Sequence, residues 1–401
     1  MKLSLRYKSL CVLLVLMATL NLHCQRVKHL ILLKPVHPPL ISLSPDQHPS
    51  FQDSGDEEEL RQALKNQISY FSRLKQPVSY PLGKTAISSE TLRATLEKFL
   101  QILEENEDKD LNQLIRTYFD LYQSTGENGT GEVTFTGYYI PQLEGSLNAD
   151  EKYSYPLYRA PDDLTIKAIN PNGIKKAVRI ENGREYPYYT RKQIDQEGAL
   201  QGKGYEVAYL KDLFDCYLLH VQGSGTLKLP DGSLFHLHFA GSNYLPYRSL
   251  REEMLKDGIL SPYNASMESI RAYFSEHPEQ LDPYLNRNKR YTFFEEWEGE
   301  MVGSLGVPLT PGRSIATDKQ IFPPGALSYI KTAVPYLNSS GTIEKNIPWS
   351  RFVLNQDEGG AIKGPHRVDI FWGSGIQAEL TASHLKQPGK LYYLVVKDST
   401  H

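Results

Sequence analysis

The residues best suited to chemistry lie in one stretch near the C-terminus, from Gln356 to Gly375, which reads Q-D-E-G-G-A-I-K-G-P-H-R-V-D-I-F-W-G-S-G. Two carboxylates, Asp357 and Asp369, flank its central glycines, two cations lie between them, and two aromatic residues follow. Glycine allows backbone to approach a ligand closely. Aromatic rings can stack on sugar faces, and a carboxyl can exchange a proton with a glycosidic oxygen. The composition suits a saccharide site, although by itself it fits a tight β-turn region with solvated charges better.

The same stretch resembles the three-aspartate domain of the membrane-bound lytic murein transglycosylase A family. That family's segment runs D-x-G-G-A-I-K-G and continues, after a short gap, to an aspartate, an apolar-aromatic step and a glycine. Asp357 and Asp369 stand at its two aspartates, and the upstream block G-R-S-I-A-T-D-K-Q-I-F-P-P-G places the family's first aspartate at Asp318. The resemblance implies that Asp369 is the catalytic residue, with Asp357, Asp318 and Lys363 in support.

Three upstream blocks also resemble this family, so that the resemblance extends from Thr130 to Leu394. They are T-G-Y-Y-I-P from Thr136, V-Q-G-S-G from Val221 and A-G-S-N-Y-L-P-Y-R-S from Ala240. A glycine-rich hairpin is the alternative for the second block, because Pro-Asp-Gly follows it at a spacing typical of a turn. The substrate-binding residues that these blocks imply are Tyr138, Tyr139, Gln222, Ser224, Tyr247 and Arg248.

Apolar residues at helical spacing predict three helices before the strands begin. Their stripes start at Leu60, Leu92 and Leu111, and from Thr130 the pattern changes to alternating strand formers. The fold that the resemblance implies is mainly β: a double-psi β-barrel domain with an inserted second β-barrel-like domain, plus N-terminal helices, and glycan in the groove between the two. The expected spans are residues 60–150 for the helices and first part of the barrel, 151–284 for the insertion, and 285–401 for the rest of the barrel with the three aspartates.

The N-terminus has the pattern of a targeting segment. Three cations in the first eight residues precede an apolar run that is too short for a comfortable membrane span. We expect a lipoprotein-type signal over residues 1–24, with the lipid on Cys24, and a plain secretory signal is the alternative. Residues 25–59 contain several prolines and an acidic run, and we expect them to form a flexible tether. Cys216 would then be the one cysteine left in the mature fold, without a disulfide partner.

The activity that the resemblance implies is non-hydrolytic cleavage of the β-1,4 bond from N-acetylmuramic acid to N-acetylglucosamine in peptidoglycan, which leaves a 1,6-anhydro sugar. The muramic acid's own O6 attacks C1, so Asp369 alone can act first as the acid and then as the base. Apolar neighbours such as Phe371 would raise the pKa of Asp369 toward that role. The alternatives are a hydrolase that uses water and two carboxylates, a non-catalytic glycan-binding lipoprotein and, last, an aspartic protease.

The expected partners are peptidoglycan glycan strands and a membrane, reached through the lipid anchor. We expect the protein at the periplasmic face of the outer membrane, or secreted into the periplasm if it carries no lipid. A net charge of −3 gives no sign of nucleic-acid binding. We expect a monomer. We also expect no cofactor or metal, because the sequence has neither a metal-ligand cluster nor a nucleotide fingerprint.

Overall fold

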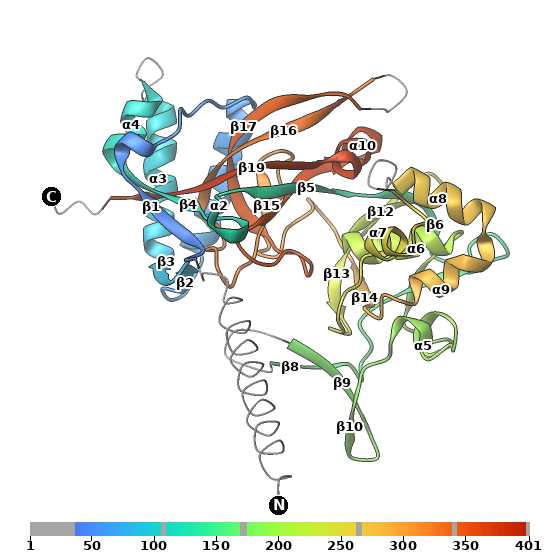
Figure 1. The fold of residues 1–401 in the computed structure, drawn as a ribbon. Helices are drawn as coiled ribbons and strands as arrows, with labels where there is room; N and C mark the ends of the chain where they lie inside the picture. The colour runs from blue at the N-terminus through green and yellow to red at the C-terminus, as the bar shows by residue number, and fades with distance from the viewer. Residues whose placement is uncertain (1–36, 106–109, 169–174, 262–266, 339–342, 398–401) are drawn as a thin grey trace, which may run out of the picture.

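The computed structural model describes residues 37–105, 110–168, 175–261, 267–338 and 343–397. These residues form two β-rich bodies, and a layer of helices from early in the chain lies against the first of them (Figure 1). The described chain is mainly β with N-terminal helices, which confirms the fold class predicted from the sequence.

A closed barrel of six strands forms the centre of the first body. Its strands pair in the ring β5–β18–β15–β17–β16–β19, and β19 pairs with β5 to close the barrel. The pairings of β5 with β18 and of β15 with β17 are parallel, and the other four are antiparallel. One early strand and five late strands therefore build a single barrel, as expected. The strands are β5 (Val133–Ile140), β15 (Ser314–Ala316), β16 (Leu327–Leu337), β17 (Ile343–Asp357), β18 (Arg367–Ser374) and β19 (Lys386–Val396).

A second sheet, in the order β14–β13–β12–β6–β11–β7, makes up most of the second body. It curls until its edge strands β7 and β14 lie close together, which makes it barrel-like. Its strands come from residues 142–296, a wider span than the 151–284 expected for the insertion. The strands are β6 (Gln142–Ser146), β7 (Tyr155–Tyr158), β11 (Glu206–Leu210), β12 (Gly225–Lys228), β13 (Leu234–Ser242) and β14 (Thr292–Glu296).

Short helices cover this second sheet, and a small three-stranded sheet projects from the same body (Figure 1). Helices α5 and α6 position residues of the site. Helix α6 ends at Gln222, next to the first body, and α5 begins at Arg191, which supports the segment around Arg290. The elements are α5 (Arg191–Asp195), α6 (Leu213–Gln222), α7 (Leu250–Lys256), α8 (Met267–Glu276), α9 (Leu281–Leu285), β8 (Thr165–Ala168), β9 (Lys175–Glu181) and β10 (Arg184–Pro187).

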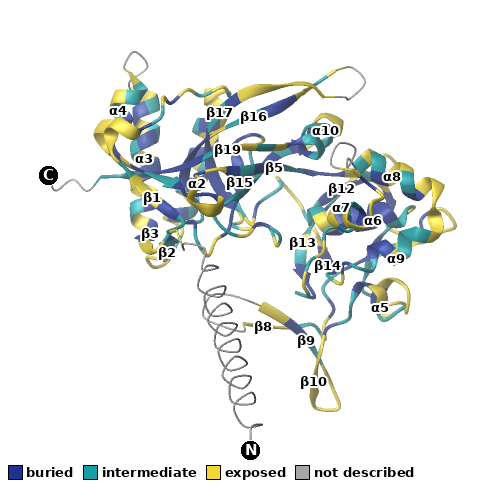
Figure 2. Ribbon diagram, in the orientation of Figure 1, coloured by how far each residue is buried: buried dark blue, intermediate teal, exposed yellow. Residues whose placement is uncertain are grey.

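The N-terminal helices pack their apolar faces against the barrel. Helix α2 (Glu57–Ser72) contributes buried residues such as Leu64, and α3 (Ser89–Glu105) contributes Phe99, to the same core cluster as the barrel strands. Buried residues run along the strands of this body (Figure 2). The third predicted stripe forms α4 (Leu111–Tyr118), so all three predicted helices are present. A hairpin of β2 (Ser79–Leu82) and β3 (Thr85–Ser88) joins α2 to α3.

The segment of residues 37–56, which we call the N-terminal strap, is docked on the barrel, so the expectation of a flexible tether is wrong for this part. Its strand β1 (Leu40–Leu43) pairs with β4 (Phe119–Ser124), which in turn pairs with β19. Phe51 lies in the barrel core, 3% exposed. Although this segment contains prolines and acidic residues, Phe51 anchors it in the core and Asp53 pairs with a buried arginine of the barrel. Residues 25–36 of the expected tether lie outside the described residues.

The buried charge that holds the strap is Arg313, whose side chain is 0% exposed. Its Nη1 donates to Asp53 Oδ2 at 2.6 Å and to the carbonyl of Phe352 at 2.9 Å, and its Nη2 donates to the carbonyl of Asp56 at 2.5 Å. Asp53 Oδ2 also accepts from the Phe352 backbone N–H at 2.8 Å. A buried ion pair of this kind ties the strap to the start of β15, because neither charge can leave the other without a large desolvation cost.

We predict that Asp53→Asn lowers the free energy of unfolding by about 3–5 kcal/mol, the usual cost of leaving a buried charge without its partner. Urea titration of both proteins would measure the change. Glu57→Gln is the matched control, since it removes the partner of Arg61 from the exposed face of α2 and should cost less than about 1 kcal/mol. Equal effects of the two substitutions would contradict the assignment of Arg313 as the anchor of the strap.

Candidate active site

A groove of about 1850 Å³ runs between the barrel and the second body. The barrel contributes strand residues and the loop after β17, and the second body contributes the end of α6 and the segments around residues 244 and 290. The residues of the groove that matter below are Thr136, Tyr138, Gln222, Ser224, Tyr247, Arg290, Asp357, Lys363, Arg367 and Asp369.

Asp369 is held in the middle of β18, where two other strands flank it. It lies opposite Ala316 of β15 and opposite Thr136 of β5. Its Oδ1 accepts a hydrogen bond from the Thr136 hydroxyl, and no other described residue donates to its carboxyl. Burial raises the pKa of Asp369 above the ordinary aspartate value, while the Thr136 hydrogen bond and the charge of Arg367 oppose that shift. Asp369 thus faces the groove as a carboxyl with one oxygen uncommitted and a raised affinity for a proton.

Asp357, at the end of β17, is in the opposite situation, because both of its carboxyl oxygens accept hydrogen bonds from the protein. Its Oδ1 accepts from the backbone N–H groups of Ser304 and Glu358, both at 2.9 Å, and its Oδ2 accepts from the Tyr138 hydroxyl at 2.9 Å. Burial raises the pKa of Asp357, and these hydrogen bonds oppose the shift. The three donors give Asp357 the geometry of a group that fixes the loop around it.

Asp318 and Lys363 belong to the support of the same loop. Asp318 is 5% exposed, and its Oδ2 accepts from the Gly364 backbone N–H at 2.9 Å. Its Oδ1 accepts from the Gln320 backbone N–H at 3.1 Å, and Lys363 Nζ lies 4.0 Å from the same oxygen with its side chain 62% exposed. Asp318 does not line the groove, so its contacts hold the glycine-rich loop after Asp357 rather than a ligand.

Four of the six residues expected to bind substrate line the groove, namely Tyr138, Gln222, Ser224 and Tyr247. Gln222 is the last residue of α6, and Gly223 ends that helix in the left-handed conformation with φ 82°. The V-Q-G-S-G block is therefore a helix end, and its last residue, Gly225, begins the first strand of the hairpin that was considered as the alternative. The Pro-Asp-Gly turn suggested by the sequence does form, at residues 230–232 between β12 and β13.

Tyr139 and Arg248 do not line the groove. Successive side chains of a strand point to opposite faces, so Tyr138 faces the groove while Tyr139 is buried against helix α10 (Ile376–His384). Arg248 is exposed, and its backbone N–H donates to Asn288 Oδ1 at 3.2 Å. Neither side chain is placed to contact a ligand in the groove, and for these two residues the sequence-based assignment is corrected.

Sequence reasoning missed Thr136, the residue that donates to Asp369 from 233 positions away in the chain. It also missed Arg290, which lines the groove although its neighbours in the sequence suggested only a strand. The first could have been inferred from the T-G-Y-Y-I-P block, where a hydroxyl stands at a position that the fold brings beside the acid. The second carries no comparable signal, because its position depends on tertiary contacts.

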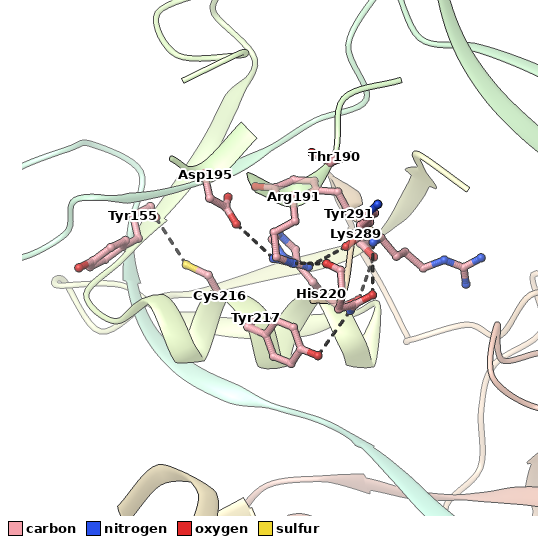
Figure 3. Close-up of polar contacts among 12 residues, drawn as sticks. Tyr155, Thr190, Arg191, Asp195, Cys216, Tyr217, His220, Lys289 and Tyr291 are labelled. Carbon is pink, nitrogen blue, oxygen red and sulfur yellow. Dashed lines mark hydrogen bonds and ion pairs between the residues drawn. The ribbon is translucent and has the colours of Figure 1, made fainter. Parts of the chain in front are cut away.

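Those contacts centre on Arg191, the first residue of α5, which is 1% exposed (Figure 3). Its guanidinium donates to the carbonyls of Asn288 and Arg290, at 3.3 and 2.9 Å, and it forms an ion pair with Asp195 at 3.3 Å. Its Nη1 also lies 2.8 Å from His220 Nδ1. Because arginine has only donors, that nitrogen of His220 is the acceptor. Burial and the charge of Arg191 hold the pKa of His220 well below its ordinary value, so the ring is neutral.

Within the described residues there is no group of three or more histidine, cysteine, aspartate or glutamate side chains placed to hold a metal ion. Cys216 is buried in the core of the second body, and burial raises the pKa of its thiol well above the ordinary value. It packs as an apolar residue and takes no part in the groove. No helix among the described residues has both the length and the apolar character needed to span a membrane.

Two sequence models match this chain. The one described as "MltA specific insert domain" matches residues 134–295, and the one described as "3D domain" matches residues 313–395. Membrane-bound lytic murein transglycosylase A of Vibrio cholerae is 31% identical to this chain over 285 residues, which are 69% of each protein. The protein of the same name from Escherichia coli K12 is 31% identical over 278 residues, also 69% of each protein.

Solved structures give the same result for the fold. A membrane-bound lytic murein transglycosylase from Agrobacterium tumefaciens has a TM-score of 0.74 and 27% identity, covering 89% of this chain and 97% of its own. MltA from Neisseria gonorrhoeae has a TM-score of 0.67 and 26% identity, covering 89% of this chain and 92% of its own. E. coli MltA with bound chitohexaose, at 24% identity, has a TM-score of 0.68 and covers 90% of this chain and 95% of its own.

The raised pKa of Asp369 makes a prediction about stability. The folded protein binds a proton at this carboxyl more tightly than the unfolded chain does, so this group reduces stability as the pH rises above its unfolded pKa. We predict that Asp369→Asn raises the melting temperature by a few degrees at about pH 7 and changes it little at about pH 3, which is below the ordinary aspartate pKa, so that the carboxyl is mostly protonated in both states.

Asp231→Asn is the control with the opposite sign, because hydrogen bonds from Ser233 lower the pKa of this exposed turn residue. It should not raise the melting temperature at either pH. A stabilisation by Asp369→Asn that is the same at both pH values would mean that the buried charge is not its cause.

Proposed function

The chain belongs to the membrane-bound lytic murein transglycosylase A family, and on that premise we propose that it is a peptidoglycan lytic transglycosylase. The proposed reaction cleaves the β-1,4 bond between N-acetylmuramic acid and N-acetylglucosamine without water and leaves 1,6-anhydro-muramoyl ends. The relatives that carry this name support the class of reaction.

The observation that carries the proposal is the unequal engagement of the two carboxyls. Asp357 accepts three hydrogen bonds from the protein, whereas Asp369 accepts one, from Thr136. A hydrolase needs a second free carboxyl to activate water or to attack the sugar. Of the two aspartates that line the groove, Asp369 is the less engaged, and a single free aspartate suits a reaction in which the substrate supplies its own nucleophile.

The proposed steps use Asp369 twice. The Thr136 hydroxyl donates to Oδ1, so in the proposed mechanism the acid proton is carried on Oδ2, the oxygen that accepts from no described residue. Asp369 gives this proton to the glycosidic oxygen as the bond from that oxygen to C1 of the muramoyl residue breaks. The muramoyl O6 forms the new bond to C1, and its proton passes to the Asp369 carboxylate, which restores the acid. The raised pKa of Asp369 keeps a share of the carboxyl protonated in advance.

We propose that the glycan lies along the groove, as the chitohexaose bound to the E. coli relative suggests. Tyr138 presents its ring at the groove while its hydroxyl is held by Asp357. Gln222 and Ser224 offer an amide and a hydroxyl from the other wall, where Tyr247 adds a second ring. Amides and hydroxyls of this kind can hydrogen-bond the N-acetyl and hydroxyl groups of the sugars, and the rings can cover their apolar faces.

Localisation is the last part of the proposal. Cys24 and the rest of the expected signal lie outside the described residues. The relatives are named membrane-bound, which supports an association of this chain with the envelope. We propose that a lipid on Cys24 anchors the protein at the periplasmic face of the outer membrane, and that it acts there as a monomer.

We predict that Asp369→Asn lowers kcat on purified sacculi by about 10²–10⁴-fold, the usual contribution of a positioned acid or base, while glycan affinity stays within a few-fold. Asp357→Asn should lose activity together with melting temperature, since an amide cannot accept all three hydrogen bonds that the carboxylate accepts. Two variants that are both fully folded and both inactive would favour the hydrolase with two carboxylates. Substantial turnover by Asp369→Asn would remove it from the catalytic role.

We predict that Cys24→Ala moves the protein from the membrane fraction to the soluble periplasmic fraction without loss of specific activity. Cys11→Ala is the matched control, because this cysteine lies inside the apolar run and would leave with the signal. Fractionation and immunoblotting would follow both variants. A Cys24→Ala protein that stays in the membrane fraction would show that something other than this lipid anchors it.

A further inference from the structure

Two arginines of the groove, Arg290 and Arg367, have no carboxylate within ion-pair distance in the described part of the chain. A neighbouring groove cation, Lys319, differs in that it is paired with Glu358 at 2.7 Å. We propose that Arg290 and Arg367 together form a subsite that binds a carboxylate of the glycan beside the bond that Asp369 cleaves. This inference rests on the proposed function, because it assumes that a peptidoglycan strand fills the groove.

Arg367 is tied to the catalytic strand. It stands two positions before Asp369 on β18, and residues two apart on a strand share a face, so both side chains face the groove. The Arg367 side chain makes no hydrogen bond to any described residue, and its Nε is buried without a partner. Its two Nη atoms are not buried and have no hydrogen-bond partner among the described residues, and a ligand carboxylate is a partner whose geometry suits them.

Arg290 approaches the same region from the other wall. Its Nε donates to the carbonyl of Leu245 at 3.0 Å, and its backbone carbonyl is held by the buried Arg191. Figure 3 shows Arg191 reaching toward the segment of Lys289 and Tyr291 that carries it. With its Nε fixed in this way, the end of the Arg290 guanidinium remains for a ligand.

Gly360 explains how close Arg290 comes to the three-aspartate loop. A Cβ on Gly360 would overlap Nη1 of Arg290, so only glycine at this position leaves room for the guanidinium. The second body therefore inserts a positive charge against the loop that follows Asp357. This contact gives a physical reason for the second glycine of the G-G pair in the D-x-G-G-A-I-K-G segment.

Tyr247 links the two arginines. Burial is the main cause of its raised pKa, and the charges of Arg367 and Asp369 also act on it from the barrel side. Tyr247 in turn is one of the groups whose charge acts on the pKa of Arg290, which burial lowers. All four of these residues line the same groove. Arg367 stands two positions before Asp369 on β18, and the Arg290 guanidinium lies against Gly360 in the loop after β17.

The chemistry of the strand identifies what such a subsite selects. N-acetylmuramic acid and N-acetylglucosamine alternate, and the muramoyl residue alone carries a lactyl group with a carboxyl. Only one of the two registers places the muramoyl C1 and O6 at Asp369. Two guanidinium groups beside Asp369 would favour that register. They form ion pairs with a carboxylate on the reacting muramoyl residue, whereas N-acetylglucosamine has no carboxylate to bind. In peptide-bearing strands the lactyl carboxyl is an amide, and the nearest carboxylates belong to the stem peptide.

The test measures binding by calorimetry in the Asp369→Asn protein, so that no ligand is consumed. The ligands are chitohexaose, a bare muramoyl-containing hexasaccharide, the same hexasaccharide with its lactyl carboxyls converted to methylamides, and a peptide-bearing hexasaccharide. We expect Arg290→Gln and Arg367→Gln each to weaken the carboxylate ligand about tenfold or more, and chitohexaose less than about twofold. Lys319→Gln, the control cation that is already paired, should weaken all ligands alike.

The affinities of the variants for the four ligands show which carboxylate the subsite binds. Loss of the extra affinity on methylamide conversion assigns it to the lactyl group, and an arginine effect confined to the peptide-bearing ligand assigns it to the stem peptide. Gly360→Ala, which displaces Arg290 without changing a charge, should reproduce the selectivity of Arg290→Gln. Melting curves confirm that each variant is folded.

The subsite is overturned if both arginine variants weaken chitohexaose as much as the carboxylate ligands, or if neither weakens any ligand. Failure of the proposed function is detected in a different experiment: the products that the unsubstituted protein releases from sacculi would contain the elements of water. That result would leave a carboxylate preference intact. Failure of the Asp369→Asn protein to bind any of the four glycans would overturn the subsite and the proposed function together.

Discussion

The structure depends on one constraint, which is that a carboxyl must be kept in a partly buried position with a single hydrogen-bond partner. Asp369 meets this constraint because β18 is held between β15 and β5, so that Thr136 lies opposite it. Strands β18 and β5 come from segments that are more than two hundred residues apart, and only closure of the barrel brings them together. Burial then makes the carboxyl a better acid, and the absence of further donors among the described residues leaves one oxygen for a substrate.

The second body completes the groove and depends on buried charge in its turn. Arg191 is fully buried, and its donors fix the carbonyls of the segment that carries Arg290. Arg313 plays a comparable part in the barrel, where it ties the N-terminal strap to β15. Buried arginines that are paired with a carboxylate and with backbone carbonyls fix the position of chain segments, because any shift would leave a charge unpaired. One buried arginine therefore holds a wall of the groove, and another holds the strap against the barrel.

The three N-terminal helices and the change to strands could be predicted from the sequence, because helical stripes and alternating strand formers reflect local packing. The barrel with its insertion and the three aspartates came from the family resemblance instead, since the composition of the glycine-rich stretch alone fits a turn region better. The strap could not be predicted, because Asp53 gains its meaning only from Arg313, 260 positions later. Tyr139 and Arg248 were misassigned because a short motif does not show which face of a strand or loop a side chain takes. Thr136 and Arg290 were missed because their roles arise from contacts across the fold.

The central claim is that one carboxyl suffices because the muramoyl O6, and not water, attacks C1. Digestion of purified sacculi in water enriched in ¹⁸O, followed by mass spectrometry of the soluble fragments, tests it most directly. The account predicts muropeptides with the mass of the 1,6-anhydro form and no ¹⁸O at the newly formed ends. Fragments heavier by one water, with ¹⁸O on C1, would contradict it and would make Asp357 or another carboxyl a necessary second catalyst.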